Sequence, residues 1–401
     1  MDDRRRFLRA VAAASTVGLA GCLGDDDEEG GLVPEEDATL SLDPDPPAEP
    51  DWRSFQADAA NTGLAAGEGP TDGVERWRFE TGDGIYSSPA VVDGTVYVGG
   101  DDGSVYAVAA EDGDERWRYG TDGTVSSSPA VADGTVYVGS QDGSVYALDA
   151  EDGDERWRYG TGGMVAGSPT VADGTVYVAS GDGSLYALDA EDGDERWQFD
   201  EPEGAIQRAP AVADGTVYVG STDYRLYAVD DDGGERWRYE TDDWIQSRPT
   251  VADGAVFVGS NDDHVHAVEA EDGELRWAFP TEGSVVASPA VVDGVVFVGS
   301  FDARLYALST AAADEEGPGG VVLPDRYYWR AEGVRELRSS PAVAGETVYV
   351  GSEDGRLYGI DATDGSERWR HEAEASVASS PAVVDGVVYV GDGDGRLWAV
   401  E

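Results

Sequence analysis

The chain has 401 residues, and its 82 acidic side chains against 27 basic ones give a formal net charge of −55 at pH 7. Binding to nucleic acid is excluded, because phosphate contacts need Lys and Arg, and the sequence contains no Lys at all. The 11 Trp and 19 Tyr residues indicate a folded core, and so acidic a surface is typical of a halophilic protein, whose carboxylates are screened by concentrated salt.

The first 22 residues have the pattern of an export signal. An Arg cluster that ends at Arg9 precedes a weakly apolar stretch, Ala10 to Gly21, that is too short to span a bilayer. The cluster resembles the twin-arginine export signal, and the residues Leu19 to Cys22 resemble a lipobox. The resemblance implies cleavage before Cys22 and attachment of a lipid to its thiol, the only one in the chain. A plain N-terminal membrane helix is the alternative.

Residues 23–50 are acidic and rich in Pro, and they show no hydrophobic periodicity. Like charges along such a segment repel one another and keep it extended. We therefore expect a disordered tether between the lipid anchor and the folded domain, and a short lead-in segment, residues 51–73, before that domain begins.

From residue 74 onward, one unit of about 40 residues recurs eight times, the period of a propeller blade. Each unit holds one Pro and one Trp at fixed places. The Pro residues are Pro89, Pro129, Pro169, Pro210, Pro249, Pro289, Pro341 and Pro381, and the Trp residues are Trp77, Trp117, Trp157, Trp197, Trp237, Trp277, Trp329 and Trp369. Both series contain one long gap, which indicates an insertion around Ala311 to Asp325.

Within a unit, four short apolar or β-branched segments are separated by Asp-Gly pairs, the strongest two-residue hairpin signal. Each unit is therefore a four-stranded antiparallel meander, and the chain is predicted to be an all-β, eight-bladed β-propeller. The repeat region, residues 74–401, begins with a fourth strand and ends after a third one. The N-terminal strand would thus complete the last blade and close the ring, whereas an unclosed solenoid would leave that edge exposed.

The residues Ala147 to Trp157 carry a family resemblance. Their sequence, ALDAEDGDERW, resembles the tryptophan-docking motif A-x-D-x-x-T-G-x-x-x-W of PQQ-type quinoprotein propellers, with Asp152 in place of Thr. The motif recurs in most units. Residues 51–73 resemble the lead-in segment of that family, and we expect them to pack on the domain without a chemical role. The resemblance implies that each Trp ring joins neighbouring blades and that the motif has no catalytic role.

Two functions are open within this family. The chain resembles the lipid-anchored BamB scaffold family, which implies a non-catalytic binding or scaffold module on the outer face of the cytoplasmic membrane, without a cofactor. Its partners would be other cell-surface or secreted proteins, or an anionic ligand, and we expect a monomer. The alternative is a PQQ-dependent dehydrogenase with quinone and calcium on the propeller axis. We favour the binding module, because the chain lacks the adjacent Cys pair and the long insertions of those enzymes.

The later units deviate from the first three at two places: the loop entering the inner strand, and the turn between the second and third strands. In a four-stranded meander these places share one face of the ring. Arg and aromatic side chains, which are common in binding interfaces, gather there. The predicted binding residues are Gln207, Arg208, Tyr224, Arg225, Trp244, Gln246, Arg248, His264, Phe301, Arg304 and Arg338. The alternative is that these Arg residues only balance neighbouring Asp residues. With three His in the chain, no metal site is expected.

Overall fold

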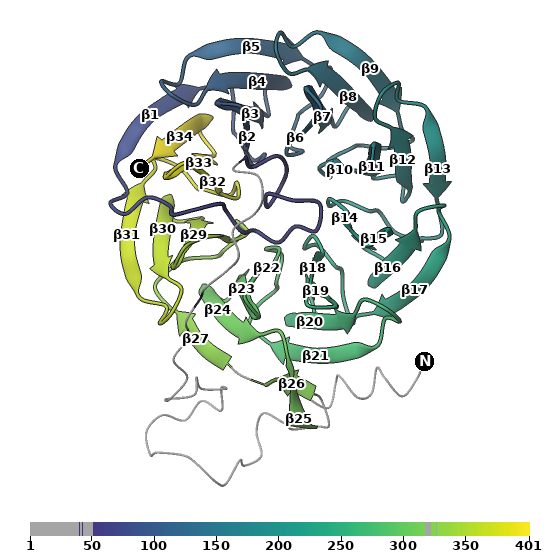
Figure 1. Cartoon of the computed structure of the whole chain (residues 1–401), viewed down its shortest axis with the longest axis vertical. Helices are drawn as coiled ribbons and strands as arrows, with labels where there is room; N and C mark the ends of the chain where they lie inside the picture. Colours follow the sequence, from purple (N-terminus) through teal and green to yellow (C-terminus); the bar gives the residue numbers. More distant parts are fainter. Residues whose placement is uncertain (1–39, 41, 43–50, 317–321, 326) are drawn as a thin grey trace.

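The computed structural model describes residues 40, 42, 51–316, 322–325 and 327–401. The predicted export signal, Cys22 and nearly all of the predicted tether lie outside these residues. Eight four-stranded antiparallel sheets stand around a central axis and form a closed ring, as Figure 1 shows. The predicted eight-bladed β-propeller is therefore confirmed. No helix that could cross a membrane occurs in the described residues.

The blades are numbered in chain order, and each begins with its inner strand. Blade 1 comprises β2 (Ala90–Val92), β3 (Thr95–Gly99), β4 (Ser104–Ala109) and β5 (Glu115–Gly120), and blade 2 comprises β6 (Ala130–Ala132), β7 (Thr135–Gly139), β8 (Ser144–Asp149) and β9 (Glu155–Gly160). Blade 3 comprises β10 (Thr170–Ala172), β11 (Thr175–Ala179), β12 (Leu185–Asp189) and β13 (Glu195–Phe199), and blade 4 comprises β14 (Ala211–Ala213), β15 (Thr216–Gly220), β16 (Arg225–Asp230) and β17 (Glu235–Glu240). Blade 5 comprises β18 (Thr250–Ala252), β19 (Ala255–Gly259), β20 (His264–Glu269) and β21 (Leu275–Pro280), and blade 6 comprises β22 (Ala290–Val292), β23 (Val295–Ser300), β24 (Arg304–Ser309) and β27 (Tyr327–Ala331). Blade 7 comprises β28 (Ala342–Ala344), β29 (Thr347–Ser352), β30 (Arg356–Asp361) and β31 (Glu367–Glu372), and blade 8 comprises β32 (Ala382–Val384), β33 (Val387–Gly391), β34 (Arg396–Val400) and β1 (Glu75–Glu80).

The turn between the first two strands of a blade explains the recurrent Asp-Gly pair. In blade 1 both central residues are left-handed, with φ of 49° at Asp93 and 68° at Gly94. Such a two-residue turn matches the twist of its flanking strands, and Asp-Gly tolerates its backbone best. The strand that follows, β3, is buried throughout, because neighbouring blades cover both of its faces.

The ring closes as the repeat predicts. Strand β1 pairs antiparallel with β34, so that Arg78 lies opposite Trp398. Val74 and Glu401 also exchange two backbone hydrogen bonds of 2.8 Å each. The first strand of the repeat region is thus the outer strand of the last blade, and blade 8 combines strands from the beginning and the end of that region.

Each motif Trp joins its blade to the next one. Trp77 Nε1 donates a hydrogen bond of 3.0 Å to the carbonyl of Ala110, and the other seven Trp residues make the equivalent bond. Gly113 has a φ of 80°, and a Cβ at this position would lie 2.8 Å from the Trp77 ring, which explains why the motif requires Gly four residues before its Trp. For Trp369 the acceptor is Pro70, since blade 8 ends before such a turn.

The insertion lies between the third and fourth strands of blade 6. Its strands β25 (Ala312–Glu316) and β26 (Val322–Pro324) form a separate two-stranded sheet, which projects from the rim of the ring in Figure 1. Leu40 and Leu42 are buried in a cluster with residues of blades 6 and 7, including Phe297 and Trp329.

Candidate functional site

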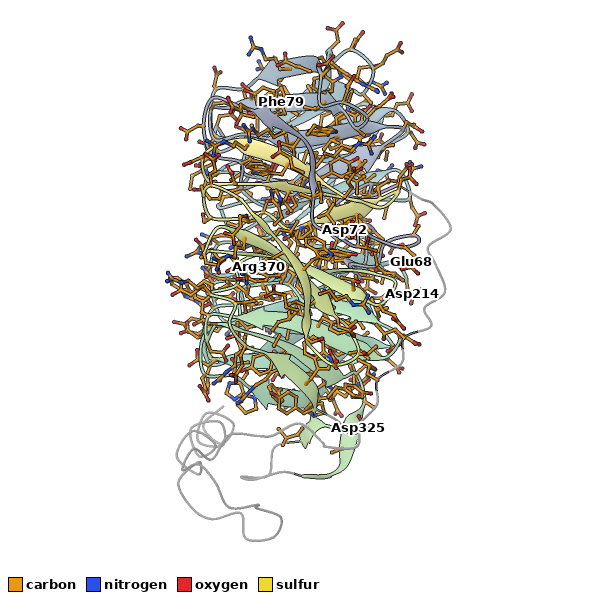
Figure 2. The ribbon with its side chains drawn as sticks, turned by 90° about the vertical axis from the view of Figure 1, so that its left-hand side faces the viewer. Glu68, Asp72, Phe79, Asp214, Asp325 and Arg370 are labelled. Atoms are coloured by element: carbon orange, nitrogen blue, oxygen red, sulfur yellow. The ribbon has the colours of Figure 1, made fainter. Side chains whose placement is uncertain are left out.

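The loops between blades and the turns between second and third strands lie on one face, the interblade-loop face. In blade 1 the N–H of Asp101, in the turn, donates to the carbonyl of Gly84, in the loop, at 2.9 Å. The same bond recurs in every other blade, and in blade 5 it joins Asn261 to Trp244 at 2.9 Å. The positions of all eleven predicted binding residues fall on these loops and turns or beside them. The remaining turns form the opposite face, and the side view in Figure 2 shows Glu68 and Asp214 along that edge of the disc.

Exposed large apolar side chains gather on the interblade-loop face. Six such side chains are exposed in the described residues, and four of them, Tyr86, Met164, Tyr224 and Trp244, lie on this face. Of the other two, Val74 directly precedes β1, and Leu275 begins β21 after a turn of the opposite face. Exposed apolar side chains beside charged ones are typical of protein interaction surfaces.

Most of the predicted arginines are paired with acidic neighbours. Arg225 lies 3.8 Å from Asp223, Arg304 lies 2.8 Å from Glu282, and Arg338 lies 3.1 Å from Glu353. For these three residues the geometry fits the alternative in which Arg balances local carboxylates. The guanidinium of Arg338 also lies 5.1 Å from the ring centre of Phe301, so these two predicted residues are in contact.

His264 belongs to a small polar cluster at the turn of blade 5. His264 Nδ1 lies 2.8 Å from the carbonyl of Asp262, and His266 Nε2 lies 3.2 Å from both carboxylate oxygens of the same residue. Burial lowers the pKa of His264, but the contact with Asp262 outweighs burial and raises it. In most other blades a Tyr hydroxyl replaces His266 and donates to the same Asp, as Tyr146 does to Asp142 at 2.7 Å. The cluster is therefore a structural variant of a repeated contact.

Arg208 and Arg248 differ from the other predicted arginines, because neither is paired with a carboxylate in the described residues. Arg208 Nε donates a 2.8 Å hydrogen bond to the carbonyl of Gln246, and Arg248 Nη2 donates a 3.0 Å bond to Ser168 Oγ. Burial lowers the pKa of both guanidinium groups, and the neighbouring positive charges of Arg338 and Arg208, respectively, lower it further. The interblade-loop face thus contains unneutralised positive charge in a strongly acidic protein.

The lead-in segment fills the axis of the ring. Figure 1 shows residues 51–65, in purple, crossing the centre. Their backbone carbonyls accept hydrogen bonds from the inner strands of six blades: the donors are Val91, Val131, Val212, Val251, Val291 and Val343, at 2.7 to 2.9 Å. The buried amide of Gln56 donates to the carbonyls of Pro289 and Pro341, and that of Asn61 donates to Pro210 and Pro249. The segment was expected only to pack on the domain, and this axial position was not predicted.

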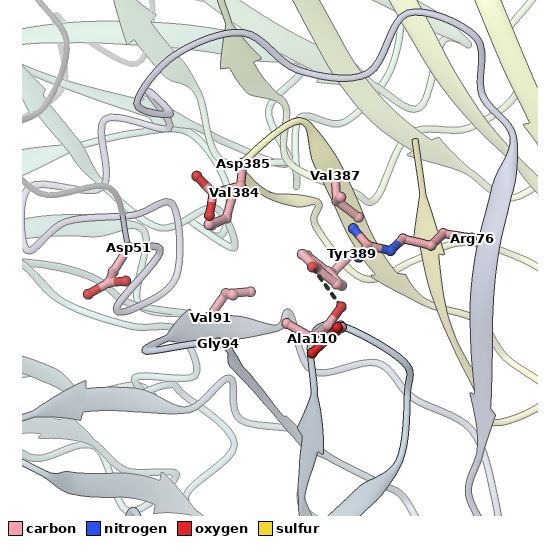
Figure 3. A pocket seen from close by; sticks show the side chains of 10 residues that line it. Asp51, Arg76, Val91, Gly94, Ala110, Val384, Asp385, Val387 and Tyr389 are labelled. Atoms are coloured by element: carbon pink, nitrogen blue, oxygen red, sulfur yellow. Dashed lines mark hydrogen bonds between the residues drawn. The ribbon is translucent and has the colours of Figure 1, made fainter.

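A cavity of about 210 Å³ opens where blades 8 and 1 meet (Figure 3). Asp51, Arg76 and Asp385 line it, and Tyr389 donates a 3.4 Å hydrogen bond to the carbonyl of Ala110 at its wall. In five other blades the Arg equivalent to Arg76 donates to a Thr hydroxyl, which Val387 replaces here. The cavity is smaller than the roughly 300–1,000 Å³ of typical cofactor sites.

The residues on the axis do not fit a quinone with calcium. Trp52, Phe55, Gln56 and Asn61 are buried there and occupy the space that a planar cofactor would need. Calcium takes six to eight oxygen ligands. In the part of the chain that the structure describes, no group of three or more His, Cys, Asp or Glu side chains is placed to hold a metal ion.

Comparisons with known proteins agree with the fold. The family model described as outer membrane protein assembly factor BamB matches residues 61–164, 124–243, 231–316 and 324–401. BamB from Moraxella catarrhalis is similar, with a TM-score of 0.68 and 18% identity over 82% of this chain and 97% of that chain. The quinohemoprotein alcohol dehydrogenase from Comamonas testosteroni has a TM-score of 0.71 and 18% identity over 88% of this chain and 80% of that chain. No curated protein matches the sequence. At such low identity, the likeness to the solved structures concerns the fold alone.

Proposed function

The chain belongs to the PQQ-like β-propeller repeat family whose model is described as outer membrane protein assembly factor BamB, and from that membership we propose that it is a non-catalytic binding module, lipid-anchored at the outer face of the cytoplasmic membrane. The interblade-loop face is its recognition surface. The partner is another cell-surface or secreted protein, and the role in assembly that the name BamB describes is not part of the proposal.

One observation carries this proposal: exposed apolar side chains and unpaired arginines occupy the same face. Trp244 is 43% exposed and Met164 is 56% exposed. Trp and Arg are the residues most often found at the energetic centres of protein interfaces. A ring built for structure alone has no reason to replace the small residues of its first units with Trp244, Arg208 and Arg248 in later ones.

The enzymatic alternative has less support. Its quinone would have to share the axis with residues 51–65, and its calcium would lack a carboxylate cluster among the described residues. Purified protein that reduced a dye with PQQ, calcium and an alcohol would contradict the binding-module proposal.

Trp244→Ala is expected to weaken partner capture without changing the melting temperature. The side chain is largely exposed and contributes little to the core, whereas truncating an interface Trp typically costs 2 kcal/mol or more, about a 30-fold loss of affinity. The measurement is recovery of the partner from salt-adapted membranes in molar salt, quantified by mass spectrometry. Leu275→Ala, at an exposed site of the opposite face, is the matched control. Equal capture by both variants would remove Trp244 from the recognition surface.

Cys22→Ser is expected to abolish lipidation and to move the protein from the membrane fraction to the medium or to the uncleaved precursor. Serine has no thiol to carry a lipid, and the rest of the chain offers no other Cys. Fractionation with mass spectrometry of the N-terminus tests this expectation. Wild-type protein without lipid, distributed like the variant, would reject the anchor.

A further inference from the structure

A belt of serines surrounds the axis near the interblade-loop face. In six blades the residue before the inner-strand Pro is Ser, and its hydroxyl accepts a hydrogen bond from the same position of a neighbouring blade. The bonds of 2.7 to 2.9 Å run from Ser340 to Ser380, Ser88, Ser128 and Ser168, and from Arg248 to Ser288 and Ser340. Only Ala209 and Arg248 depart from Ser, in adjacent blades 4 and 5.

These two departures interrupt the belt, and at one of them Arg248 places a charged side chain in a buried position. Its side chain crosses from blade 5 to Ser168 of blade 3, and its guanidinium lies 3.4 Å from the ring centre of Phe55 in the axial segment. Arg248 is only 7% exposed, and its Nη1 atom has no hydrogen-bond partner. A buried N–H donor without an acceptor costs free energy, and more so on a charged group.

Arg208 adds a second positive charge to the same place. It stands one position before the break in blade 4, where five other blades carry Ser, and only its Nε is bonded to the protein, to Gln246. The two positively charged guanidinium groups repel each other. Neither group relieves this repulsion by losing its proton, because Arg remains protonated in proteins. An anion between them would offset one of the two positive charges, reduce their repulsion and supply the missing acceptor.

We propose that the axis of the interblade-loop face binds one compact monoanion, a carboxylate or a halide, between the guanidinium groups of Arg208 and Arg248. The ligand must be small, because the ring of Phe55 closes the axis beneath Arg248 and little of Arg248 is open to solvent. The anion has two possible sources. If it is a carboxylate of the partner protein, the inference rests on the proposed function. If it is a halide from the medium, the inference is independent of that function.

The test compares variants that restore the repeat's own residues. In Arg208→Ser/Arg248→Ser both positions take the Ser that most other blades carry there, so that the candidate site loses both positive charges. Arg356→Ser is the matched control, since it also restores a repeat Ser on the same face but removes an arginine that Asp354 and Glu372 already neutralise, at 3.1 and 2.9 Å. If the double variant does not fold, Arg208→Ser alone keeps the contact between Arg248 and Phe55.

Chloride binding by the full mature chain is measured from the line width of the ³⁵Cl NMR signal in sodium chloride, with sodium acetate as competitor. We expect protein-dependent broadening for the wild type and for Arg356→Ser, and its loss in the double variant. Competition by acetate, with partner capture lost in the double variant, would identify the partner's carboxylate as the ligand. Broadening without such competition would identify a halide. Equal broadening by the wild type and the double variant, with and without acetate, would overturn the site, even if Trp244 still governs capture.

Discussion

Deletion of residues 1–80 is expected to turn the closed ring into an open, aggregating protein. The deletion removes β1, so that the backbone groups of β34 that pair with residues 75–80 would face solvent. An exposed strand edge next to apolar side chains is a template for pairing between molecules. The deletion also removes the buried Trp77. Loss of one buried Trp side chain costs about 3–5 kcal/mol, whereas the free energy of unfolding of a whole domain is about 5–15 kcal/mol.

Two shorter deletions separate the contributions to this loss. Removal of residues 1–39 leaves every described contact in place, and the melting temperature should not change. Removal of residues 1–73 keeps β1 but takes away the axial segment and Pro70, the acceptor of Trp369. It should destabilise the ring without opening it. Thermal unfolding and light scattering in molar salt measure both effects. A soluble protein with an unchanged melting temperature after deletion of residues 1–80 would contradict closure by β1.

The repeat explains how much of the fold the sequence could predict. Eight copies of the Pro and Trp landmarks specify eight blades, and the out-of-phase ends specify closure, because both signals are periodic and local. The axial segment has no such signal. Its buried amide of Gln56 bonds to the carbonyl of Pro341, 285 residues away, and its contacts exist only once the ring has formed. The sequence therefore allowed packing to be predicted for residues 51–73, but not their position on the axis.

The sequence predicted which residues belong to the candidate site, but it did not predict which of its arginines pair with a carboxylate. Deviation from the repeat located Arg208, Arg225 and Arg248 equally well. Whether such an Arg meets a carboxylate depends on the turn beside it: Arg225 follows Asp223 within one turn, whereas Arg248 lies between buried strands and the aromatic ring of Phe55. A single Ser-to-Arg change before the inner-strand Pro was the visible signal. Its meaning depended on knowing that the serines form a belt around the axis.

Transfer from molar salt to about 0.1 M salt is expected to unfold or strongly destabilise the protein. The screening length rises from about 3 Å to about 10 Å. Carboxylates on neighbouring turns therefore repel one another more strongly. The net charge of −55 already counts every arginine, and exposed ion pairs contribute only about 1 kcal/mol or less each, so these pairs do not compensate for the repulsion among the carboxylates. Circular dichroism and thermal unfolding across a salt series measure the effect.

Mild acid should restore part of the stability that dilute buffer removes. Burial raises the pKa of Asp101, and the charges of Asp83 and Asp102 raise it further, so that its ionised form destabilises the fold and protonation relieves this cost as the pH falls. The pKa of Asp142 is shifted in the opposite direction. Burial raises its pKa, but hydrogen bonds from Tyr146 and Ser144 outweigh burial and hold the pKa below the ordinary 3.8.

The stabilisation from Asp142 is therefore present above the ordinary Asp pKa and is lost as the pH falls through its lower folded value. The melting temperature in dilute buffer should accordingly pass through a maximum at mildly acidic pH and fall again in stronger acid. In molar salt the rise on the neutral side of that maximum should shrink, because screening already removes the repulsion that protonation would relieve. A melting temperature in dilute buffer that equals the one in molar salt at neutral pH would show that carboxylate repulsion does not govern the stability of this ring.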